Sequence, residues 1–189
     1  ALPAFILLIG KVQKLHRVLH RASRKIRNIQ EDAQRDTLVG CFNRRYTVAA
    51  LEEQKQLADE SGIPLCLAVI DLDHFKRVND LHGHDAGDRV LQSFAQLVEH
   101  CIRKRDRLFR FGGEEFVLLF PATDRDGARA ALEKVQRELR ENLMGPDGPV
   151  TVSIGAALLE PGEDWPTWLS RADQALYLAT RSGRDQVRF

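Results

Sequence analysis

The chain has 189 residues, of which 43% are hydrophobic and 29% charged, with a formal net charge of +1. This composition is that of a folded globular protein and excludes a disordered or low-complexity chain. Residues 1–35 carry eight Lys and Arg against two acids, a net charge of +6, whereas residues 36–189 carry 20 against 25, a net charge of −5. A mildly acidic body of this kind is not expected to bind nucleic acid.

The first 35 residues predict a helical stem. An eight-residue apolar run, residues 2–9, is followed directly by Lys11 and Lys14. Because crossing a bilayer takes about 20 apolar residues, this run is either the end of a transmembrane helix with its basic residues on the cytoplasmic side or the start of a soluble helix. From residue 8 to residue 33, apolar residues recur in steps of four and three, the pattern of a coiled-coil seam. We expect a parallel homodimer through this stem, the alternative being a single helix lying on the body.

Residues 36–189 predict a mixed α/β domain. An antiparallel hairpin among strands separated by helices indicates a sheet with helices packed on it. The expected elements, in chain order, are a helix capped by Asp36 or Asn43 and ending at 61–64, a strand over 65–70, a short helix over 74–80, a turn over 83–88, a helix over 88–101, a hairpin centred on Gly112 and Gly113, a helix over 127–143, a strand over 150–158, a helix over 165–179 and a final strand over 186–189.

Acidic residues follow the first of these strands. The strand over 65–70 is apolar throughout, so we expect it to be buried on both faces. Asp71 and Asp73 come next, and the two-residue period of a strand puts them on the same face. Carboxylates at the end of a buried strand are costly unless a cation meets them.

A second acidic pair lies at the hairpin, where Gly112 and Gly113 precede Glu114 and Glu115. Two adjacent glycines predict a tight primed turn, because such turns need positive φ. Adjacent carboxylates beside bare backbone are what a site needs to bind a nucleotide phosphate through a divalent cation. The alternative, from this motif alone, is a solvated hairpin tip.

The three cysteines, Cys41, Cys66 and Cys101, are odd in number and widely spaced. We interpret them as small hydrophobic residues in a reducing compartment, because the spacing matches neither a disulfide framework nor a zinc site.

Four motifs together resemble a known family. They are the opening run from Asp36 to Arg45, the run Asp71-Leu72-Asp73-His74-Phe75-Lys76-Arg77-Val78-Asn79-Asp80, the run Gly83-His84-Asp85-Ala86-Gly87-Asp88, and Gly112-Gly113-Glu114-Glu115-Phe116. In this order and spacing they are similar to the GGDEF domain, the bacterial diguanylate cyclase, over residues 36–189. The resemblance implies a palm-like α/β fold with a central, mostly antiparallel sheet flanked by helices, after a stem over residues 1–35.

The resemblance also implies a reaction and its partners. Two GTP molecules are joined into cyclic di-GMP, a second messenger in biofilm signalling, with release of two pyrophosphates. Each GTP is held by one protomer of a face-to-face dimer, with Mg²⁺ or Mn²⁺ as cofactor. Together with the stem, the resemblance places the full-length protein at the cytoplasmic face of the bacterial inner membrane, while this fragment is expected to be soluble.

Roles are carried over from the family position by position. Asp71, the backbone carbonyl of Leu72 and Glu115 would bind the metal ions. Glu114 would share a metal or help to deprotonate the attacking 3′-hydroxyl. Hard oxygen ligands of this kind suit Mg²⁺ that bridges a triphosphate.

For the nucleotide, the resemblance assigns the guanine edge to Asn79 and Asp88 and the phosphates to Lys76. An Asp that accepts from guanine N1–H and N2–H₂ would disfavour adenine, whose N1 carries no proton there. The other substrate-binding positions that the resemblance implies are Phe75, Gly112, Gly113, Arg184 and Arg181.

Arg103 and Asp106 form an RxxD motif shortly before the hairpin. In the family this motif is the inhibitory site that binds the product, cyclic di-GMP. Arginine suits such a site because its fork can bind phosphate bidentately and its plane can stack on guanine. The neighbouring Arg105, Arg107 and Arg110 are interpreted as solvated charge.

Near its C-terminus the chain departs from the family pattern. The family usually has a Lys three residues before Gly-Arg-Asn. Here Thr180 stands in place of the Lys and Asp185 in place of the Asn, whereas Arg184 is kept. Arg181 is a candidate for supplying the missing charge, and phosphate affinity is the property that these changes affect.

Two other functions stay open at this point. A catalytically silent module that binds GTP or cyclic di-GMP and regulates partners would keep the fold, although such members of the family usually lose the signature carboxylates or glycines, all of which are present here. A cyclase for another nucleotide is disfavoured by Asn79 and Asp88. An assay that compares GTP with ATP separates these functions.

Overall fold

The computed structural model describes His16 and residues 33–189. The predictions of a coiled-coil stem and of a membrane-spanning end concern residues that lie almost entirely outside the described ones. Within the described residues, no helix has both the length and the apolar content that a membrane crossing requires. Residues 36–189 form one compact unit.

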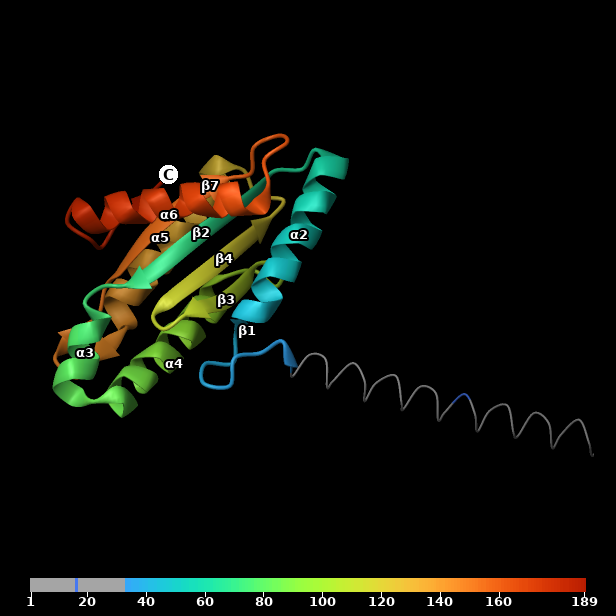
Figure 1. Cartoon of the computed structure of the whole chain (residues 1–189). Coiled ribbons are helices and arrows are strands. Elements are labelled where there is room, and N and C mark those ends of the chain that lie inside the picture. The colour runs from blue at the N-terminus through green and yellow to red at the C-terminus, as the bar shows by residue number, and fades with distance from the viewer. Residues whose placement is uncertain (1–15, 17–32) are drawn as a thin grey trace, which may run out of the picture. The chain divides into compact units, whose positions relative to one another are not determined.

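A six-stranded sheet runs through the middle of this unit (Figure 1). The central strand β2 pairs antiparallel with both β4 and β7, and only the short edge strands β1 and β8 join in parallel. The predicted mixed α/β fold with a mostly antiparallel sheet is therefore confirmed. Side by side, the strands are β1 (Phe42–Asn43), β3 (Arg107–Gly112), β4 (Glu115–Pro121), β2 (Leu65–Leu72), β7 (Val152–Leu158) and β8 (Val187–Arg188).

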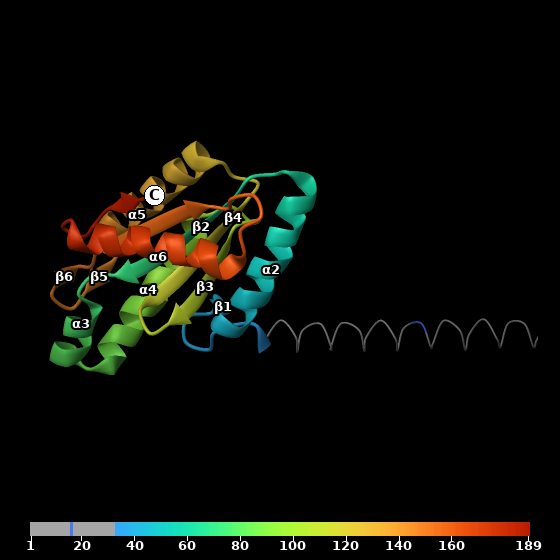
Figure 2. The same ribbon diagram turned by 45° about the horizontal axis from the view of Figure 1, so that its top comes forward.

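Helices cover both faces of the sheet (Figure 1 and Figure 2). On one face lie α2 (Arg44–Ser61) and α6 (Trp165–Arg181), and on the other lie α4 (His84–Cys101) and α5 (Arg125–Asn142). The short helix α3 (Phe75–His82) follows β2 and packs against α4. A small hairpin of β5 (Met144–Gly145) and β6 (Gly148–Pro149) was not predicted, because strands of two residues show no periodicity.

Alternate residues of β2 enter two separate hydrophobic clusters. Leu67 and Val69 pack with residues of α2 and α6, whereas Ala68 and Ile70 pack with residues of α4 and α5. All four side chains are buried, so the strand is covered on both faces, as its unbroken apolar sequence predicted. Trp168 fills the first cluster, and its indole N–H donates to a backbone carbonyl of β7 at 2.9 Å, which satisfies the donor of a buried Trp.

Capping residues set the two ends of α2. Asn43 Oδ1 accepts a hydrogen bond from the backbone N–H of Tyr46 at 3.1 Å, and Gly62 ends the helix in the left-handed region at φ 67°. Of the two predicted caps, Asn43 is therefore the one used. Asp36 instead accepts from two backbone N–H groups in the turn before β1.

The turn predicted over 83–88 is wrong beyond Gly83. Helix α4 already begins at His84, so a single residue separates it from α3. Gly83 has φ 79° and ψ 166°, a conformation open to a residue without Cβ, and it lets the chain change direction at once. Asp85 lies in the first turn of α4, where a carboxylate interacts favourably with the helix dipole. Asp88, predicted to start the helix, lies about one turn inside it.

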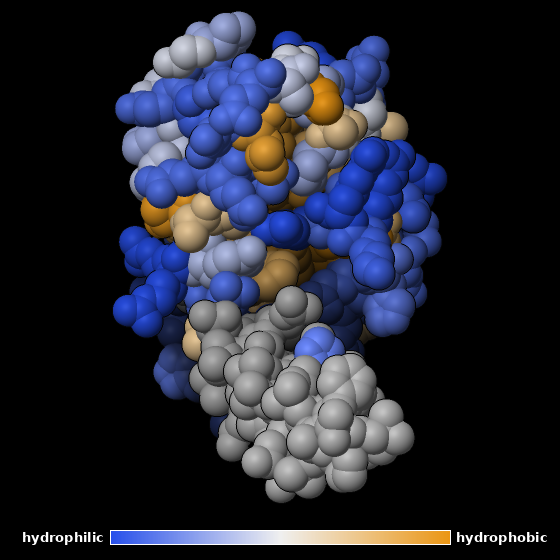
Figure 3. All heavy atoms as spheres, turned by 90° about the vertical axis from the view of Figure 1, so that its right-hand side faces the viewer, coloured by the Kyte–Doolittle hydropathy of each residue, from blue (hydrophilic) through white to orange (hydrophobic). Residues whose placement is uncertain are grey.

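Figure 3 shows the surface on the α2 side of the molecule. Hydrophilic residues dominate its coloured part, and hydrophobic residues form small areas between them. Single exposed apolar side chains are ordinary on protein surfaces and do not by themselves mark an interface. Among the residues that the structure describes, the large apolar ones that are about half exposed are Leu57, Ile63, Leu81, Met144, Tyr177 and Leu178.

Candidate functional site

Asp71 and Glu115 lie opposite each other on neighbouring strands. They are direct partners in the antiparallel register of β2 and β4, and directly opposed residues point to the same face of a sheet. By the two-residue alternation this is the face of Val69 and Val117, which α6 covers. The apolar middle of β2 and β4 therefore continues into a pair of carboxylates.

The pKa of Asp71 is raised to about 7. Burial is the largest cause, followed by the negative charges of Glu114, Glu115 and Asp73. The guanidinium of Arg184 acts in the opposite direction and lowers this pKa. A carboxylate in such surroundings lacks positive charge, and a further cation would stabilise its ionised form.

Glu114 has similar surroundings. Its pKa is raised, chiefly by burial and then by the charge of Glu115, and the ammonium of Lys76 lowers it. Lys76 is an exposed residue of α3. The structure thus brings the three predicted carboxylates together with Lys76 and Arg184, although these residues come from β2, the β3–β4 hairpin, α3 and the loop after α6.

The hairpin that carries Glu114 and Glu115 is not the predicted primed turn. Gly112 pairs with Glu115 after a register shift that follows Arg110, and neither Gly112 nor Gly113 has a positive φ. The prediction failed because the chain reverses with the help of this irregularity in β3, which adds local twist, and so does not need a primed turn. The tip is nevertheless bare, because nothing lies within 4 Å of a Cβ built on Gly113.

Arg110 joins this hairpin tip to the start of the domain. Its Nε and Nη2 donate to the carbonyl oxygen of Gly113 at 3.1 and 2.9 Å, and its Nη1 donates to Asp36 Oδ1 at 3.2 Å. Arg107 is also bound, since its Nη1 donates to the Tyr46 hydroxyl at 3.0 Å. The interpretation of Arg107 and Arg110 as solvated charge is therefore wrong. Their partners lie 61 and 74 residues away in the sequence, which no local pattern reveals.

Asn79 and Asp88 lie on the adjoining helices α3 and α4. Gly87 lies close to the first of them: a Cβ on Gly87 would be 2.0 Å from Asn79 Oδ1 and 3.0 Å from Phe75 Cζ. Both Asn79 and Asp88 are partly exposed, so their polar ends can meet a ligand. Phe75 is 4% exposed and belongs to the hydrophobic core, so it supports this corner from inside.

The loop after α6 is held against the end of β2. Arg184 and Asp185 have φ of 62° and 46°, and the backbone N–H of Asp185 donates to Asp73 Oδ2 at 3.1 Å. Asp73 is buried and also accepts from the hydroxyls of Thr151 and Ser153 at 2.7 Å each. The sequence had drawn attention to Asp73 but had given it no role. In the structure it joins the loop to the strand that carries the cluster.

Thr180 and Arg181 make their polar contacts within α6. Thr180 Oγ1 donates to the carbonyl oxygen of Leu176 at 3.1 Å. Arg181 Nη1 donates to the Tyr177 hydroxyl at 2.8 Å, and its guanidinium lies 5.6 Å from the centre of the Tyr177 ring. Of the two predicted arginines, Arg184 is the one whose charge acts on Asp71.

Arg103 and Asp106 form a turn between α4 and β3. Asp106 Oδ2 accepts from the backbone N–H of Arg103 at 2.9 Å, and the backbone N–H of Asp106 donates to the Arg103 carbonyl at 2.9 Å. Within the described part of the chain, the other carboxylate oxygen of Asp106 is buried without a hydrogen-bond partner. Burial raises the pKa of this carboxyl. The Arg103 side chain beside it is exposed.

A cavity of about 450 Å³ adjoins the carboxylates. It lies between the sheet and α6, and its lining is mostly apolar, as is usual for small-molecule sites. Its lining residues are Val69, Phe111, Glu115, Val117, Trp165, Pro166, Leu169, Ser170 and Asp173.

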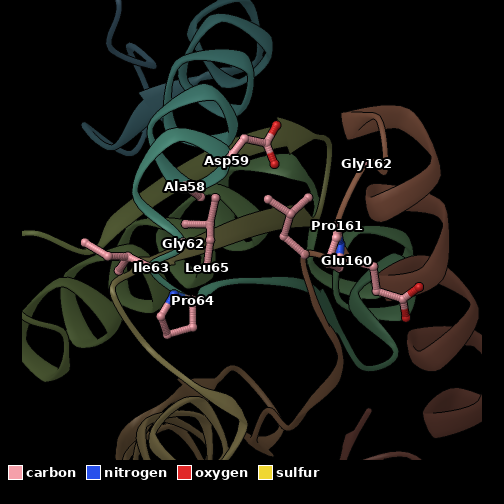
Figure 4. Close-up of a pocket in the computed structure, with 10 residues that line it drawn as sticks. Ala58, Asp59, Gly62, Ile63, Pro64, Leu65, Glu160, Pro161 and Gly162 are labelled. Carbon is pink, nitrogen blue, oxygen red and sulfur yellow. The ribbon is translucent and has the colours of Figure 1, made fainter.

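Another cavity, of about 420 Å³, lies between the end of α2 and the loop before α6 (Figure 4). It is lined by Leu65, at the opposite end of β2 from Asp71. Its charged lining residues, Asp59 and Glu160, form ion pairs with Lys55 and Arg171 at 2.5 and 3.3 Å. None of the residues predicted to bind metal or nucleotide lines this cavity.

The residues at the end of β2 fit a divalent cation without enclosing one. Among the described residues, no group of three or more His, Cys, Asp and Glu side chains is arranged to hold a metal ion. Mg²⁺ is usually bound by one or two carboxylates, with water and substrate phosphates as its other ligands. Asp71 and Glu115 are two such carboxylates in register, and burial together with the nearby carboxylates raises the pKa of Asp71, so a bound cation would favour its ionised form.

Fold and site together define a mixed α/β domain with a mostly antiparallel sheet and an acidic cluster at the end of its central strand. The family model described as diguanylate cyclase, GGDEF domain, matches residues 33–186. The chain therefore belongs to the GGDEF-domain family of diguanylate cyclases, which confirms the resemblance found in its four motifs.

Curated relatives are similar over most of this chain. Diguanylate cyclase DgcP of Pseudomonas aeruginosa is 40% identical over 161 residues, which are 84% of this chain and 24% of DgcP. Diguanylate cyclase DgcM of Escherichia coli K12 is 39% identical over 161 residues, which are 84% of this chain and 39% of DgcM. The chain thus spans less than half the length of these relatives.

Solved structures match as well. The coiled coil and GGDEF domain of DgcB from Caulobacter crescentus, in complex with c-di-GMP, has a TM-score of 0.83 at 31% identity, with 96% of this chain and 98% of that chain covered. Diguanylate cyclase SiaD from Pseudomonas aeruginosa, in complex with its activator SiaC, has a TM-score of 0.83 at 36% identity, with 98% of this chain and 74% of that chain covered.

Proposed function

We propose that this GGDEF domain joins two GTP molecules into cyclic di-GMP and releases two pyrophosphates. The observation that carries the proposal is the carboxylate cluster, in which Asp71 and Glu115 are opposed in register and burial, followed by neighbouring negative charges, raises the pKa of Asp71 and Glu114. Such a cluster would be stabilised by a divalent cation, which can also bind the phosphates of a nucleotide. All of the signature carboxylates and glycines are present, which favours an active enzyme over a silent binding module.

Asp71, the backbone carbonyl of Leu72 and Glu115 are the groups that would hold Mg²⁺ or Mn²⁺. Diguanylate cyclases of this family generally use a divalent metal. When bound, the ion neutralises negative charge on the triphosphate and orients it for in-line attack. Lys76 and Arg184, whose charges act on Glu114 and Asp71, would bind phosphate oxygens directly.

Asn79 and Asp88 would select guanine. Their partly exposed polar ends lie on adjoining helices, and a carboxylate left without the guanine donors would disfavour adenine. Glu114 is suited to accept the proton of the attacking 3′-hydroxyl, because burial and the charge of Glu115 raise its pKa and make it a stronger base than an exposed Glu.

Ring closure would require two domains that face each other, because one domain would hold only one GTP. A dimer through the stem, residues 1–35, would raise the effective concentration of the second domain. The net charge of +6 on this stem also suits the cytoplasmic face of a bacterial inner membrane, where a tether would hold the full-length protein.

Arg103 and Asp106 would bind the product and limit the reaction. Support comes from the buried, unpartnered oxygen of Asp106, which a donor of the guanine base would satisfy. The exposed Arg103 guanidinium can bind phosphate or stack on the base.

The test is to incubate the purified chain with GTP and Mg²⁺ at several protein concentrations and to separate the products by chromatography. Cyclic di-GMP and pyrophosphate should increase more than linearly with protein, and ATP should give no product. Glu115→Gln should lower turnover by about a hundredfold or more, whereas Glu133→Gln, on the exposed face of α5, should not. GTP that is bound by the folded chain but left unchanged would establish a silent module instead.

A further inference from the structure

Helix α5 is hydrogen-bonded to the loop that carries Arg184. Arg140 Nε donates to Asp185 Oδ2 at 2.8 Å, and Arg140 Nη2 donates to the carbonyl oxygen of Asp185 at 3.3 Å. Gln136, one turn earlier on α5 and buried, donates to Asp185 Oδ1 at 3.2 Å. Both carboxylate oxygens of Asp185 are therefore bound by one helix.

The other side of the same residue is bound to the end of β2. The backbone N–H of Asp185 donates to Asp73 Oδ2, and the buried carboxylate of Asp73 is fixed in turn by Thr151 and Ser153. Asp185 thus lies between α5 and the strand end that carries Asp71.

Arg184 directly precedes this anchor, and its backbone is strained. Its φ of 62° is in the left-handed region, which a residue with a long side chain keeps only when its surroundings hold it there. The backbone N–H of Arg184 donates to the carbonyl of Ala179 at 3.1 Å, and the contacts of Asp185 fix the following peptide. The direction of the Arg184 side chain therefore depends on the hydrogen bonds between α5 and Asp185.

We propose that Arg140 is a positioning residue for the nucleotide phosphates. It holds Asp185 so that Arg184 faces the acidic cluster, and it neutralises the negative charge that Asp185 places beside a site for a triphosphate. An Asn at position 185 would bring no such charge, so the need for Arg140 follows from Asp185. This inference rests on the proposed function only in taking the ligand to be GTP.

The first measurement compares Arg140→Ala with the wild-type chain in the presence of Mg²⁺. The probes are a non-hydrolysable GTP analogue and GMP, and calorimetry gives both dissociation constants. Affinity for the triphosphate should fall about tenfold, because a small displacement of Arg184 removes its phosphate contact. Affinity for GMP should change less than about twofold, since the residues assigned to guanine lie on α3 and α4. In turnover, KM should rise more than kcat falls.

Rescue separates positioning from simple loss of stability. In the double variant Arg140→Ala with Asp185→Asn, the unpaired carboxylate is removed but the hydrogen bonds of Arg140 stay lost, so triphosphate affinity should recover only in part, to about threefold below that of wild type. Arg140→Lys keeps the charge, and its triphosphate affinity should lie between those of Arg140→Ala and wild type. Arg137→Ala, at an exposed position of the same helix, is the matched control and should behave as wild type. If Arg140→Ala does not fold, the affinities of Arg140→Lys and Asp185→Asn for the triphosphate analogue and for GMP are compared with those of wild type instead.

Unchanged triphosphate affinity in Arg140→Ala, or an equal loss for GMP, would overturn the inference. The proposed function fails in a different way, through a wild-type chain that makes no cyclic di-GMP. In that case the binding comparison still decides whether Arg140 positions Arg184, because it needs no turnover.

Discussion

Gly87 and Asn79 are in such close contact between α4 and α3 that a Cβ on Gly87 would lie 2.0 Å from Asn79 Oδ1. Because real Cβ atoms do not approach an oxygen so closely, Gly87→Ala must displace the Asn79 side chain. We expect this change to weaken binding of a GTP analogue by about tenfold and to reduce the preference for GTP over ATP. Calorimetric titration with both nucleotides measures the effect. Selectivity equal to that of wild type would remove Asn79 from guanine recognition.

Gly113 offers the opposite case at the hairpin tip. A Cβ there meets nothing within 4 Å, and its φ is not positive, so alanine fits the backbone. Gly113→Ala should change the free energy of unfolding by less than about 0.5 kcal/mol in urea titrations. A primed turn would instead be destabilised by about 1 kcal/mol or more. Turnover should nevertheless fall if the bare backbone of the tip approaches the substrate, so stability and activity are measured on the same sample.

The carboxylate cluster was predictable because each of its parts is local in the sequence. An unbroken apolar run identifies β2 as buried on both faces, and the residue after that run, Asp71, lies near the strand end. Adjacent glycines and glutamates mark the hairpin. The order and spacing of the motifs then identify the family, and its fold brings these segments together.

The supports of the cluster were not predictable, because their partners are distant in the sequence. Arg110 meets Asp36 across 74 residues, and Asp73 meets Ser153 across 80 residues. Likewise, the strands missed by periodicity have only two residues each. The start of α4 was misplaced because a glycine followed by polar residues indicates a turn, whereas here a single glycine, Gly83, accommodates the change of direction.

Stability should depend on pH through Asp71 when no divalent cation is present. Its pKa is raised from 3.8 to about 7 on folding, so the folded state binds the proton more tightly than the unfolded state. The stabilising contribution is complete below about pH 4 and is lost as the pH rises through about 7. In EDTA, the melting temperature of wild type should therefore fall relative to that of Asp71→Asn over this range. Saturating Mg²⁺ should raise the melting temperature of wild type, and the increase should be largest at the upper end of this pH range.

If the melting temperatures of wild type and Asp71→Asn changed by the same amount across this pH range, Asp71 would not be responsible for the effect. Asp173→Asn is the control, because Asp173 is an exposed residue of α6 that lines the neighbouring cavity without belonging to the cluster.

Product inhibition should depend on the exposed side chain of Arg103. In Arg103→Ala, the concentration of cyclic di-GMP that halves the initial rate should rise by about tenfold or more, because a charge-assisted contact to phosphate is lost. Folding should be unaffected, since only the backbone of Arg103 is bound by Asp106. Initial rates at increasing product concentration give the result. Lys104→Ala, at an exposed position in the same turn, provides the comparison, and equal inhibition of both variants would refute the RxxD assignment.

Thr180→Lys should strengthen phosphate binding. Thr180 is partly exposed in the last turn of α6. Among the described residues, its hydroxyl is hydrogen-bonded only to the carbonyl of Leu176 in the same helix. Removing the hydroxyl therefore leaves no hydrogen-bonding group of another element without its partner. A cation in the last turn of a helix interacts favourably with the dipole, and a Lys here would stand where the family usually has one. We expect KM for GTP to fall about threefold, with the larger effect at low salt. Thr180→Gln, a neutral side chain of similar reach, should leave KM unchanged, and an equal gain from it would show that length and not charge is responsible.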